Sequence, residues 1–243
     1  MSTCCASDHD GRQQDIVVRR PEGLKRAIDF VLAAASLTLL APVIALVAFL
    51  VAIESEGPVW FRQRRVGLHG NEFVIFKFRT MTHANASGGP LITAATDRRI
   101  TRIGKILRHA KLDELPQLVN VLFGDMSIVG PRPEVPIYVS HYRPEDRRIV
   151  FTVRPGLTDF ATLLLRDEQG LLDSVADADS YYRDVLIPFK VALAKHYAMT
   201  YSVGTDARLV ALTIVAIVST RFPLREAVRD MLGDGRLMEL GDG

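Results

Sequence analysis

The chain has 243 residues, of which 48% are hydrophobic, and is long enough for one well-packed domain plus a membrane element. Its formal net charge of only +2 argues against bulk nucleic-acid binding. The basic residues are instead clustered along the chain, which suits an anionic ligand or a lipid surface.

The first 21 residues are polar and are predicted to form a disordered tail. This tail holds both cysteines, Cys4 and Cys5. Because the two are adjacent they are a poor disulfide pair, and they match no zinc-binding spacing. They could carry acyl groups, although an unmodified tail is the simpler interpretation.

A helix is predicted over residues 22–53, and its stretch from Phe30 to Ile53 carries no charge. About 20 apolar residues suffice to cross a bilayer. The stretch is too long, and begins too far along the chain, for a typical signal peptide. Pro42 lies in its middle, where a proline removes a helix hydrogen bond and bends the chain.

Positive charge marks the cytoplasmic side of a membrane. Basic residues flank both ends of the apolar stretch: Arg19, Arg20, Lys25 and Arg26 precede it, and Arg62, Arg64 and Arg65 follow it. The residues leave two arrangements open. The helix could enter the membrane, break at Pro42 and leave on the same side, or it could be an ordinary spanning helix that tolerates a proline.

A turn at residues 56–58 is followed by two predicted strands, residues 59–66 and 72–81, joined around residues 68–71 as a hairpin. The second strand is apolar on both faces except for Lys77. A lysine there needs an anionic partner unless it reaches solvent from the strand end. Residues 82–96 are predicted to be a flexible loop.

Two helices are predicted next, over residues 99–111 and 112–123, the second ending at Gly124. The first belongs to a basic segment made of Arg98, Arg99, Arg102, Lys105, Arg108 and Lys111. The second begins with Asp113 and Glu114. The helix dipole keeps carboxylates at this end ionised, and the same end attracts phosphate. An ionised aspartate beside a phosphate site indicates phosphoryl transfer. The simpler alternatives are that the two acids only cap the helix and that Arg99 and Arg102 only face solvent.

The rest of the chain is predicted to contain a short strand at 126–129, a helical segment near 137–150 between proline-rich turns, and an amphipathic helix at 179–199. Residues 209–218 are apolar but too short to span a bilayer, so they form either core or an element in the membrane interface. His109, His141 and His196 show no metal-ligand spacing. Asp29 is expected to pair with Lys25 or Arg26.

Several motifs occur in a fixed order: Lys25-Arg26-x-x-Asp29, Gln63-x-Arg65-x-Gly67, Lys77-Phe78-Arg79-Thr80-Met81, Leu112-Asp113-Glu114-Leu115-Pro116-Gln117-Leu118 and Gly130-Pro131-Arg132-Pro133-Glu134. Each is weak alone, but their order and spacing resemble the bacterial initiating sugar transferases, or monotopic phosphoglycosyl transferases, over roughly residues 22–218. This chain resembles the minimal form of that family.

The resemblance implies a helix-rich α/β fold with a re-entrant N-terminal membrane helix hairpin bent at Pro42. A small β-hairpin and amphipathic interface helices would surround a compact catalytic core. The expected parts are a tail (1–21), the re-entrant helix (22–55), a cytoplasmic catalytic domain (56–220) and a C-terminal tail (221–243). The resemblance places the protein on the inner leaflet of the bacterial inner membrane, facing the cytoplasm; a homodimer stays open.

The activity implied is transfer of a sugar 1-phosphate from a UDP-sugar to polyprenol (undecaprenyl) phosphate, with release of UMP, as the first membrane step of glycan synthesis. By resemblance, Asp113 is the nucleophile of a covalent aspartyl intermediate and a ligand of Mg²⁺. Glu114 activates the acceptor phosphate or helps to position the metal. The expected substrate- and phosphate-binding residues are Lys77, Arg79, Arg108, Pro131, Arg132 and Asp206.

Two alternatives remain: a glycosyltransferase that releases UDP, and a non-catalytic membrane scaffold for glycan enzymes. The chain also departs from the common family pattern, since Thr158-Asp159-Phe160-Ala161-Thr162 stands where many members carry Thr-Gly-x-Ala-Gln. Because of this departure, the resemblance does not indicate which sugar the protein would use.

Overall fold

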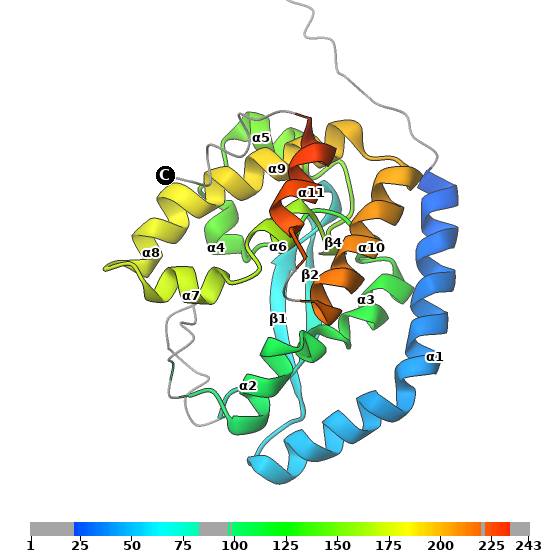
Figure 1. The fold of residues 1–243 in the computed structure, drawn as a ribbon, viewed down its shortest axis with the longest axis vertical. Coiled ribbons are helices and arrows are strands. Elements are labelled where there is room, and N and C mark those ends of the chain that lie inside the picture. The colour runs from blue at the N-terminus through cyan, green and yellow to red at the C-terminus, as the bar shows by residue number, and fades with distance from the viewer. Residues whose placement is uncertain (1–21, 83–96, 98, 220–221, 234–243) are drawn as a thin grey trace, which may run out of the picture.

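The computed structural model describes residues 22–82, 97, 99–219 and 222–233 (Figure 1). The expected N-terminal tail with Cys4 and Cys5, most of the loop predicted at 82–96, and Arg98 lie outside the described residues. The helices are α1 (Glu22–Glu54), α2 (Arg102–His109), α3 (Gln117–Phe123), α4 (Pro136–Val139), α5 (Pro144–Val150), α6 (Phe160–Leu164), α7 (Glu168–Asp173), α8 (Ala178–Tyr181), α9 (Ile187–Thr200), α10 (Val203–Val218) and α11 (Leu224–Leu232). The strands are β1 (Trp60–Val66), β2 (Glu72–Phe78), β3 (Ser127–Val129) and β4 (Gly156–Thr158).

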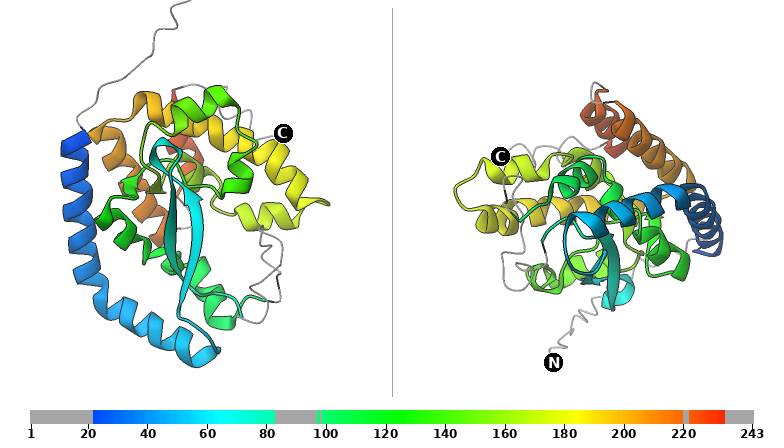
Figure 2. Two further views of the ribbon diagram at one scale, coloured as in Figure 1. Left: turned by 180° about the vertical axis from the view of Figure 1, so that it is seen from behind. Right: turned by 90° about the horizontal axis from the view of Figure 1, so that it is seen from below.

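The predicted first helix is confirmed as α1, a single helix of 33 residues with Pro42 inside it. Figures 1 and 2 show that α1 is bent, so that its two halves run in different directions along the globular body. It is the one helix in the described part of the chain that is long and apolar enough to cross a membrane. Many of its apolar side chains face outward, among them Val31, Leu39, Phe49 and Ile53.

Polar contacts hold the first half of α1 against the body. Asp29 is buried and accepts hydrogen bonds from the Ser127 hydroxyl (2.7 Å) and the Ile128 backbone N–H (3.0 Å), both in β3. Lys25 instead pairs with Asp206 of α10 at 2.5 Å, and Arg26 donates to the last carbonyls of α3. The expected pairing of Asp29 with Lys25 or Arg26 is therefore wrong, because β3 and α10 supply the nearer partners.

The second half of α1 is held at its C-terminal end. The buried Arg79 guanidinium, at the end of β2, donates to the Ser55 carbonyl (2.6 Å), the Val51 carbonyl (3.1 Å) and the Pro58 carbonyl (2.5 Å). A cation at this end also complements the helix dipole. Glu54 accepts a hydrogen bond from the Ile103 N–H of α2 at 2.9 Å. Both ends of α1 are thus bonded to the same globular body.

The predicted hairpin is confirmed: β1 and β2 pair antiparallel from Trp60↔Phe78 to Val66↔Glu72, and the hairpin runs through the middle of the molecule (Figure 2). A second sheet pairs β3 with β4 in parallel. At its end Gly130 meets Gly156 backbone to backbone. A Cβ on Gly156 would lie 2.1 Å from the Gly130 nitrogen, so neither position has room for a side chain.

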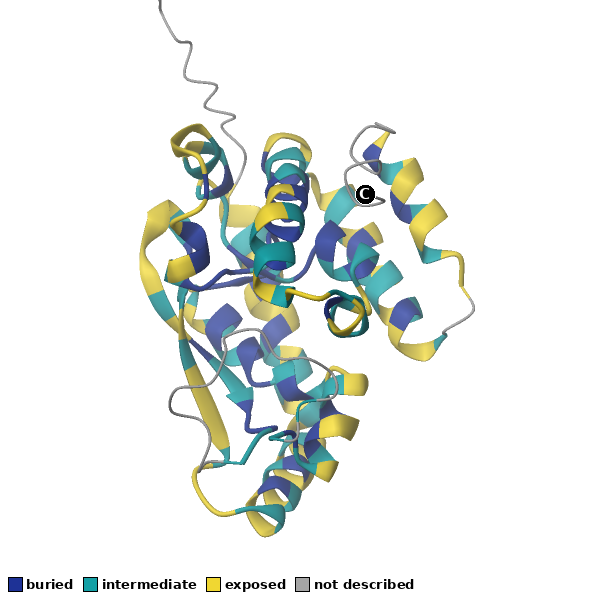
Figure 3. Ribbon diagram, turned by 90° about the vertical axis from the view of Figure 1, so that its left-hand side faces the viewer, coloured by how far each residue is buried: buried dark blue, intermediate teal, exposed yellow. Residues whose placement is uncertain are grey.

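Apolar residues from distant parts of the chain form the cores (Figure 3). One core lies between α6, α9, α10 and α11 and contains Phe160, Leu193, Tyr197, Leu209 and Val228. Another joins α1, β2 and α3. The apolar segment predicted at 209–218 belongs to the longer α10. Leu209 of this helix is buried and confirms a contribution to the core, whereas Ile214, Ile217 and Val218 are exposed.

Candidate active site

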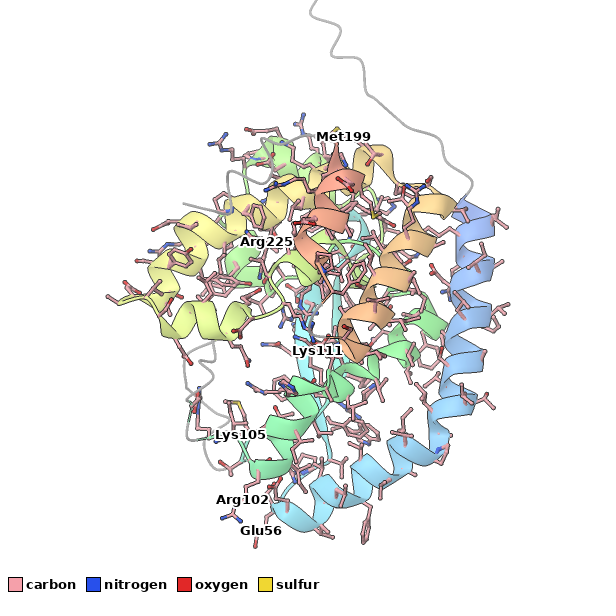
Figure 4. The ribbon with its side chains drawn as sticks, in the orientation of Figure 1. Glu56, Arg102, Lys105, Lys111, Met199 and Arg225 are labelled. Carbon is pink, nitrogen blue, oxygen red and sulfur yellow. The ribbon has the colours of Figure 1, made fainter. Side chains whose placement is uncertain are left out.

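Four segments bring five charged side chains together: Lys77 of β2, Arg108 of α2, Asp113 and Glu114 between α2 and α3, and Arg132 in the loop after β3. The connection between α2 and α3 lies near the middle of the molecule, where Figure 4 labels Lys111. Lys105, Arg102 and Glu56 lie toward the lower edge in the same view. The candidate active site is therefore built from segments far apart in sequence.

The carboxylates do not lie on one continuous helix, as predicted for residues 112–123. Lys111 adopts a left-handed conformation (φ 56°, ψ 20°) and ends α2, and Leu112–Glu114 then form a single 3₁₀ turn. Pro116 lacks an N–H and caps the start of α3 at Gln117. The tight turn thereby places two successive acidic side chains ahead of the helix, and the prediction of an uninterrupted helix is wrong.

Glu114 is held between two cations. Its carboxylate accepts from the Lys77 ammonium at 2.8 Å and from one Arg132 nitrogen at 3.0 Å, and the second terminal nitrogen of Arg132 is also bonded to it. Burial alone would raise the pKa of Glu114, but Arg132 and Lys77 outweigh burial and hold the pKa well below its usual range. The lowered pKa favours the anionic form of Glu114 and makes it a weak proton acceptor. Lys77 has the anionic partner that its place in an apolar strand requires.

Asp113 has a different environment, although it is adjacent in sequence. Its side chain is buried, and no hydrogen bond to its carboxylate is found among the described residues. Burial and the neighbouring Glu114 charge raise the pKa of Asp113, against the lowering effect of Lys77, Arg108 and Arg132. Asp113 lies in a 3₁₀ turn ahead of α3, so burial and Glu114, and not a helix dipole alone, determine the direction of its pKa shift. The site thus contains an uncoordinated carboxylate beside three cations.

Arg108 lies on the Asp113 side of the cluster. Its Nε donates to the Thr80 hydroxyl at 2.9 Å, and one of its terminal nitrogens is buried with no partner in the described part of the chain. A buried guanidinium nitrogen without a partner has lost its hydration and gains from an anionic ligand. With Asp113 ionised, three cations face two carboxylates, so the cluster carries one net positive charge.

The loop that carries Arg132 is fixed to β4 and α6. The Pro131 carbonyl accepts from the Gly156 N–H at 3.0 Å, and the Arg132 N–H donates to the Asp159 carboxylate at 3.0 Å. The loop therefore presents the Arg132 side chain toward Glu114 from a rigid backbone. Pro131, predicted to bind substrate, contributes this rigidity through its fixed backbone and its bonded carbonyl.

Two residues predicted to bind phosphate lie elsewhere. Arg79 donates to the C-terminal turn of α1, as described above, so its placement supports an anchoring role rather than a phosphate-binding one. Asp206 pairs with Lys25 and accepts from the Tyr197 hydroxyl at 2.8 Å, which joins α10 to α1 and α9. In the basic segment, Arg99 pairs with Asp97 at 2.6 Å, whereas Arg102 and Lys105 are exposed. Pro42 lies in α1, outside the cluster.

A second buried polar network adjoins the cluster, and the sequence analysis did not predict it. Glu134 accepts from the Tyr182 hydroxyl at 2.6 Å and faces Arg65 (3.7 Å) and Lys190 (3.6 Å). Burial raises the pKa of Glu134, but Lys190 and Arg65 outweigh it and leave the pKa lowered. Arg65 and Glu134 belong to the motifs quoted in the sequence analysis, and those motifs could have indicated this network. Lys190 sits in an amphipathic helix with no local sign of its role.

The described residues contain no group of three or more His, Cys, Asp or Glu side chains that could hold a metal by themselves. Magnesium is commonly held by one or two carboxylates together with substrate phosphates. Asp113, whose oxygens have no hydrogen-bond partner in the described part of the chain, fits that arrangement, whereas Glu114 is already occupied by Lys77 and Arg132. The donor set thus suits a cation only when a phosphate ligand is also present.

The chain is also similar to known proteins. Residues 20–220 match the bacterial sugar transferase family. The chain is 39% identical over 199 residues to UDP-glucose:undecaprenyl-phosphate glucose-1-phosphate transferase of Caulobacter vibrioides, covering 81% of this chain and 70% of that protein. It is 36% identical over 200 residues to exopolysaccharide production protein PSS of Rhizobium leguminosarum bv. phaseoli, covering 79% and 94%.

A third relative acts on a different sugar. UDP-N-acetylgalactosamine-undecaprenyl-phosphate N-acetylgalactosaminephosphotransferase of Aeromonas hydrophila is 37% identical over 201 residues, which cover 81% of this chain and 44% of that protein. The chain therefore spans most of two of these relatives and less than half of the third.

Proposed function

The chain belongs to the bacterial sugar transferase family, and on that premise we propose that it transfers a sugar 1-phosphate from a UDP-sugar to polyprenol phosphate. The observation that carries the proposal is the buried Asp113 carboxylate, which has no hydrogen-bond partner among the described residues and lies beside Lys77, Arg108 and Arg132. A nucleophile must be accessible to the reacting atom, and three cations favour a doubly charged diphosphate.

In the first half-reaction, a carboxylate oxygen of Asp113 forms a bond to the sugar-linked phosphorus. The bond from that phosphorus to the oxygen bridging the two phosphates breaks, and UMP leaves with the electron pair. In the second, an oxygen of polyprenol phosphate attacks the same phosphorus and expels the Asp113 carboxylate. The product is a polyprenyl diphosphate sugar, and the enzyme is regenerated. Two displacements replace one difficult encounter between anions.

The cations stabilise the charge that develops in both steps. Arg108, with a buried nitrogen that has no partner in the described chain, is suited to a donor phosphate oxygen. Lys77 and Arg132 are held by Glu114, whose low pKa favours positioning of these cations over acceptance of a proton. We propose Mg²⁺ as the cofactor, with Asp113 as its protein ligand; when bound, it would neutralise diphosphate charge.

The first test is product analysis with detergent-solubilised protein, polyprenol phosphate and a panel of UDP-sugars that includes UDP-glucose and UDP-N-acetylgalactosamine. We expect UMP and a polyprenyl diphosphate sugar, arrest by EDTA and recovery with Mg²⁺. Release of UDP would indicate a glycosyltransferase instead. Absence of any product with every sugar would favour a membrane scaffold, and activity in EDTA would reject the metal.

The pH dependence of the first half-reaction should report Asp113. Only the ionised carboxylate attacks, so single-turnover UMP release without acceptor should fall as pH falls through the raised pKa of Asp113. The midpoint should lie above about 3.9, the ordinary aspartate value, and the donor diphosphate stays ionised there. A profile that remains flat down to pH 4 would contradict this assignment.

Unfolding measured over the same range provides the control. Glu114 has a lowered folded-state pKa, so its stabilising effect is present above the unfolded-state value of about 4.3 and is lost only as pH falls through the lower folded value. The ion pairs of Glu114 should therefore persist across the acid limb of Asp113, and the loss of rate should precede unfolding.

We propose further that α1 enters the inner leaflet and returns to the cytoplasmic face. Straight, a helix of this length would span about 50 Å, yet both of its ends bond to the same globular body. A spanning helix would carry one end about 30 Å away, across the bilayer. The outward apolar residues and the bend of α1, which contains Pro42, fit a helix that dips into one leaflet.

Cysteine labelling tests this topology. Gly23→Cys and Glu56→Cys, each in a background without Cys4 and Cys5, introduce thiols at opposite ends of α1; both positions are exposed. A membrane-impermeant maleimide should label both in inverted vesicles and neither in intact spheroplasts. Labelling of either one in spheroplasts would establish a span. Pro42→Ala should straighten the helix, expose one site to the outside and lower activity.

A further inference from the structure

Asp159 links two parts of the structure through its two carboxylate oxygens. One oxygen accepts from the Thr162 N–H at 2.7 Å and caps the first turn of α6. The other accepts from the Arg132 N–H at 3.0 Å. The residue is only 5% exposed, so both bonds are shielded from water. Asp159 stands in the segment where this chain departs from the common family pattern.

The Arg132 amide is the only donor in its immediate backbone. Pro131 and Pro133 flank Arg132 and have no N–H. The Arg132 N–H is therefore the one backbone group in this three-residue segment that can donate a hydrogen bond. The two bonds on its N-terminal side, Gly130 N–H to the Thr158 carbonyl and Gly156 N–H to the Pro131 carbonyl, fix the loop up to residue 131. Asp159 holds the other side of the Pro131–Arg132 peptide, because it accepts from the N–H of the peptide whose carbonyl is bonded to Gly156, and the Arg132 side chain extends from this peptide to Glu114.

We propose that Asp159 is a positioning residue of the phosphoryl-transfer site, which it serves by orienting Arg132 against Glu114; this inference rests on the proposed function. The guanidinium of Arg132 bonds Glu114 with both terminal nitrogens, a geometry that tolerates little displacement. Misplacement by about 1 Å at a catalytic site can lower a rate by about 100-fold. The negative charge of Asp159 also helps to raise the pKa of the Arg132 guanidinium, after the larger effects of Glu114, burial and Glu168.

An acid suits this position in this chain because two N–H groups converge on it. A carboxylate accepts at both oxygens, whereas an asparagine would turn its NH₂ toward one of the donors. A serine could still cap α6 but has a single short hydroxyl. Asp159→Ser therefore keeps the helix cap but removes the bond to Arg132. If Asp159 only capped α6, this substitution would have little effect on the site.

The matched control is Asp167→Ser. Asp167 caps the next helix, α7, by accepting from the Gly170 N–H at 3.1 Å, and no bond joins it to Arg132 among the described residues. Asp159→Ser should lower kcat by about tenfold or more with a smaller change in KM, whereas Asp167→Ser should change either by less than about twofold. In an Arg132→Ala background, Asp159→Ser should add less than about twofold, because its effect acts through Arg132.

Hydrogen exchange tests the contact without relying on activity. In the full-length protein, the Arg132 amide should exchange at least about tenfold faster in Asp159→Ser than in the wild type or Asp167→Ser. Unchanged exchange at Arg132, or an unchanged kcat despite faster exchange, would overturn the proposal. So would a full further loss of rate in the Arg132→Ala background. If the wild-type chain releases no UMP, the proposed function fails, while the exchange result still decides whether Asp159 holds Arg132.

Discussion

Asp113→Asn should reduce sugar-phosphate transfer by at least about 1,000-fold, since removal of a nucleophile typically lowers a rate by several orders of magnitude. The amide keeps the shape of the side chain but cannot form the bond to phosphorus. Intact-mass measurement gives a direct reading. With UDP-sugar and no acceptor, the wild-type chain should gain the mass of one sugar phosphate, and the variant should gain none.

Folding of this variant should be unimpaired, which separates lost chemistry from lost structure. The raised pKa of Asp113 means that the folded state favours the neutral form. The ionised side chain therefore destabilises the fold at neutral pH, and that penalty disappears below the unfolded-state value. Asp113→Asn should match or exceed the wild-type melting temperature at pH 7. A stability–function trade-off of this kind is expected at an active site.

The control for Asp113→Asn is Asp125→Asn, which makes the same chemical change at an exposed position after α3. Asp125 accepts only a long bond, 3.3 Å, from the Asn120 side chain in the described structure. Its activity should remain within about twofold of the wild type. More than about a tenth of the wild-type rate in Asp113→Asn would reject the covalent mechanism.

Glu114→Gln should be the most disruptive change to the site as a structure. It leaves Lys77 and Arg132 facing each other in a largely buried place without their counter-charge. Removing one partner of a buried ion pair lowers stability by about 3–5 kcal/mol, and less where water reaches the pair. A chain of this size then loses about 5–15 °C in melting temperature.

Activity of Glu114→Gln should fall by about 100-fold or more in both half-reactions, because each depends on the two cations that Glu114 positions. A role confined to activation of the acceptor would instead spare the UMP burst. The matched control is Glu72→Gln, which removes an exposed pair with Arg64 at 3.5 Å and should change stability by less than about 1 kcal/mol.

A second substitution can check whether repulsion between Lys77 and Arg132 causes the loss of stability. Lys77→Met in the Glu114→Gln background removes one of the two repelling cations, so stability should recover in part although activity should not. A double variant that is less stable than Glu114→Gln alone would show that Lys77 stabilises the fold by packing rather than by its pairing with Glu114.

Much of this protein could be predicted from local sequence pattern. The long apolar helix, the hairpin from residues 59 to 81 and the basic helix near 99–111 follow from periodicity and turn residues, which act over a few positions. The order of the motifs from Lys25 to Glu134 was enough to indicate the family. The carboxylate pair at 113–114 was also evident, because two adjacent acids between a basic helix and an apolar one are unusual.

The roles of individual charges depend on tertiary structure, because pairing and burial are set by residues far apart in the chain. Arg79 and Asp206 looked like ligand-binding residues, but the C-terminal turn of α1 and Lys25 are their partners. Local pattern cannot separate Asp113 from Glu114: both follow Lys111 in one turn. The fold places Glu114 between Lys77 and Arg132, and leaves Asp113 buried with a raised pKa. Adjacent carboxylates thus acquire opposite properties through desolvation and long-range charge, which no short stretch of sequence encodes.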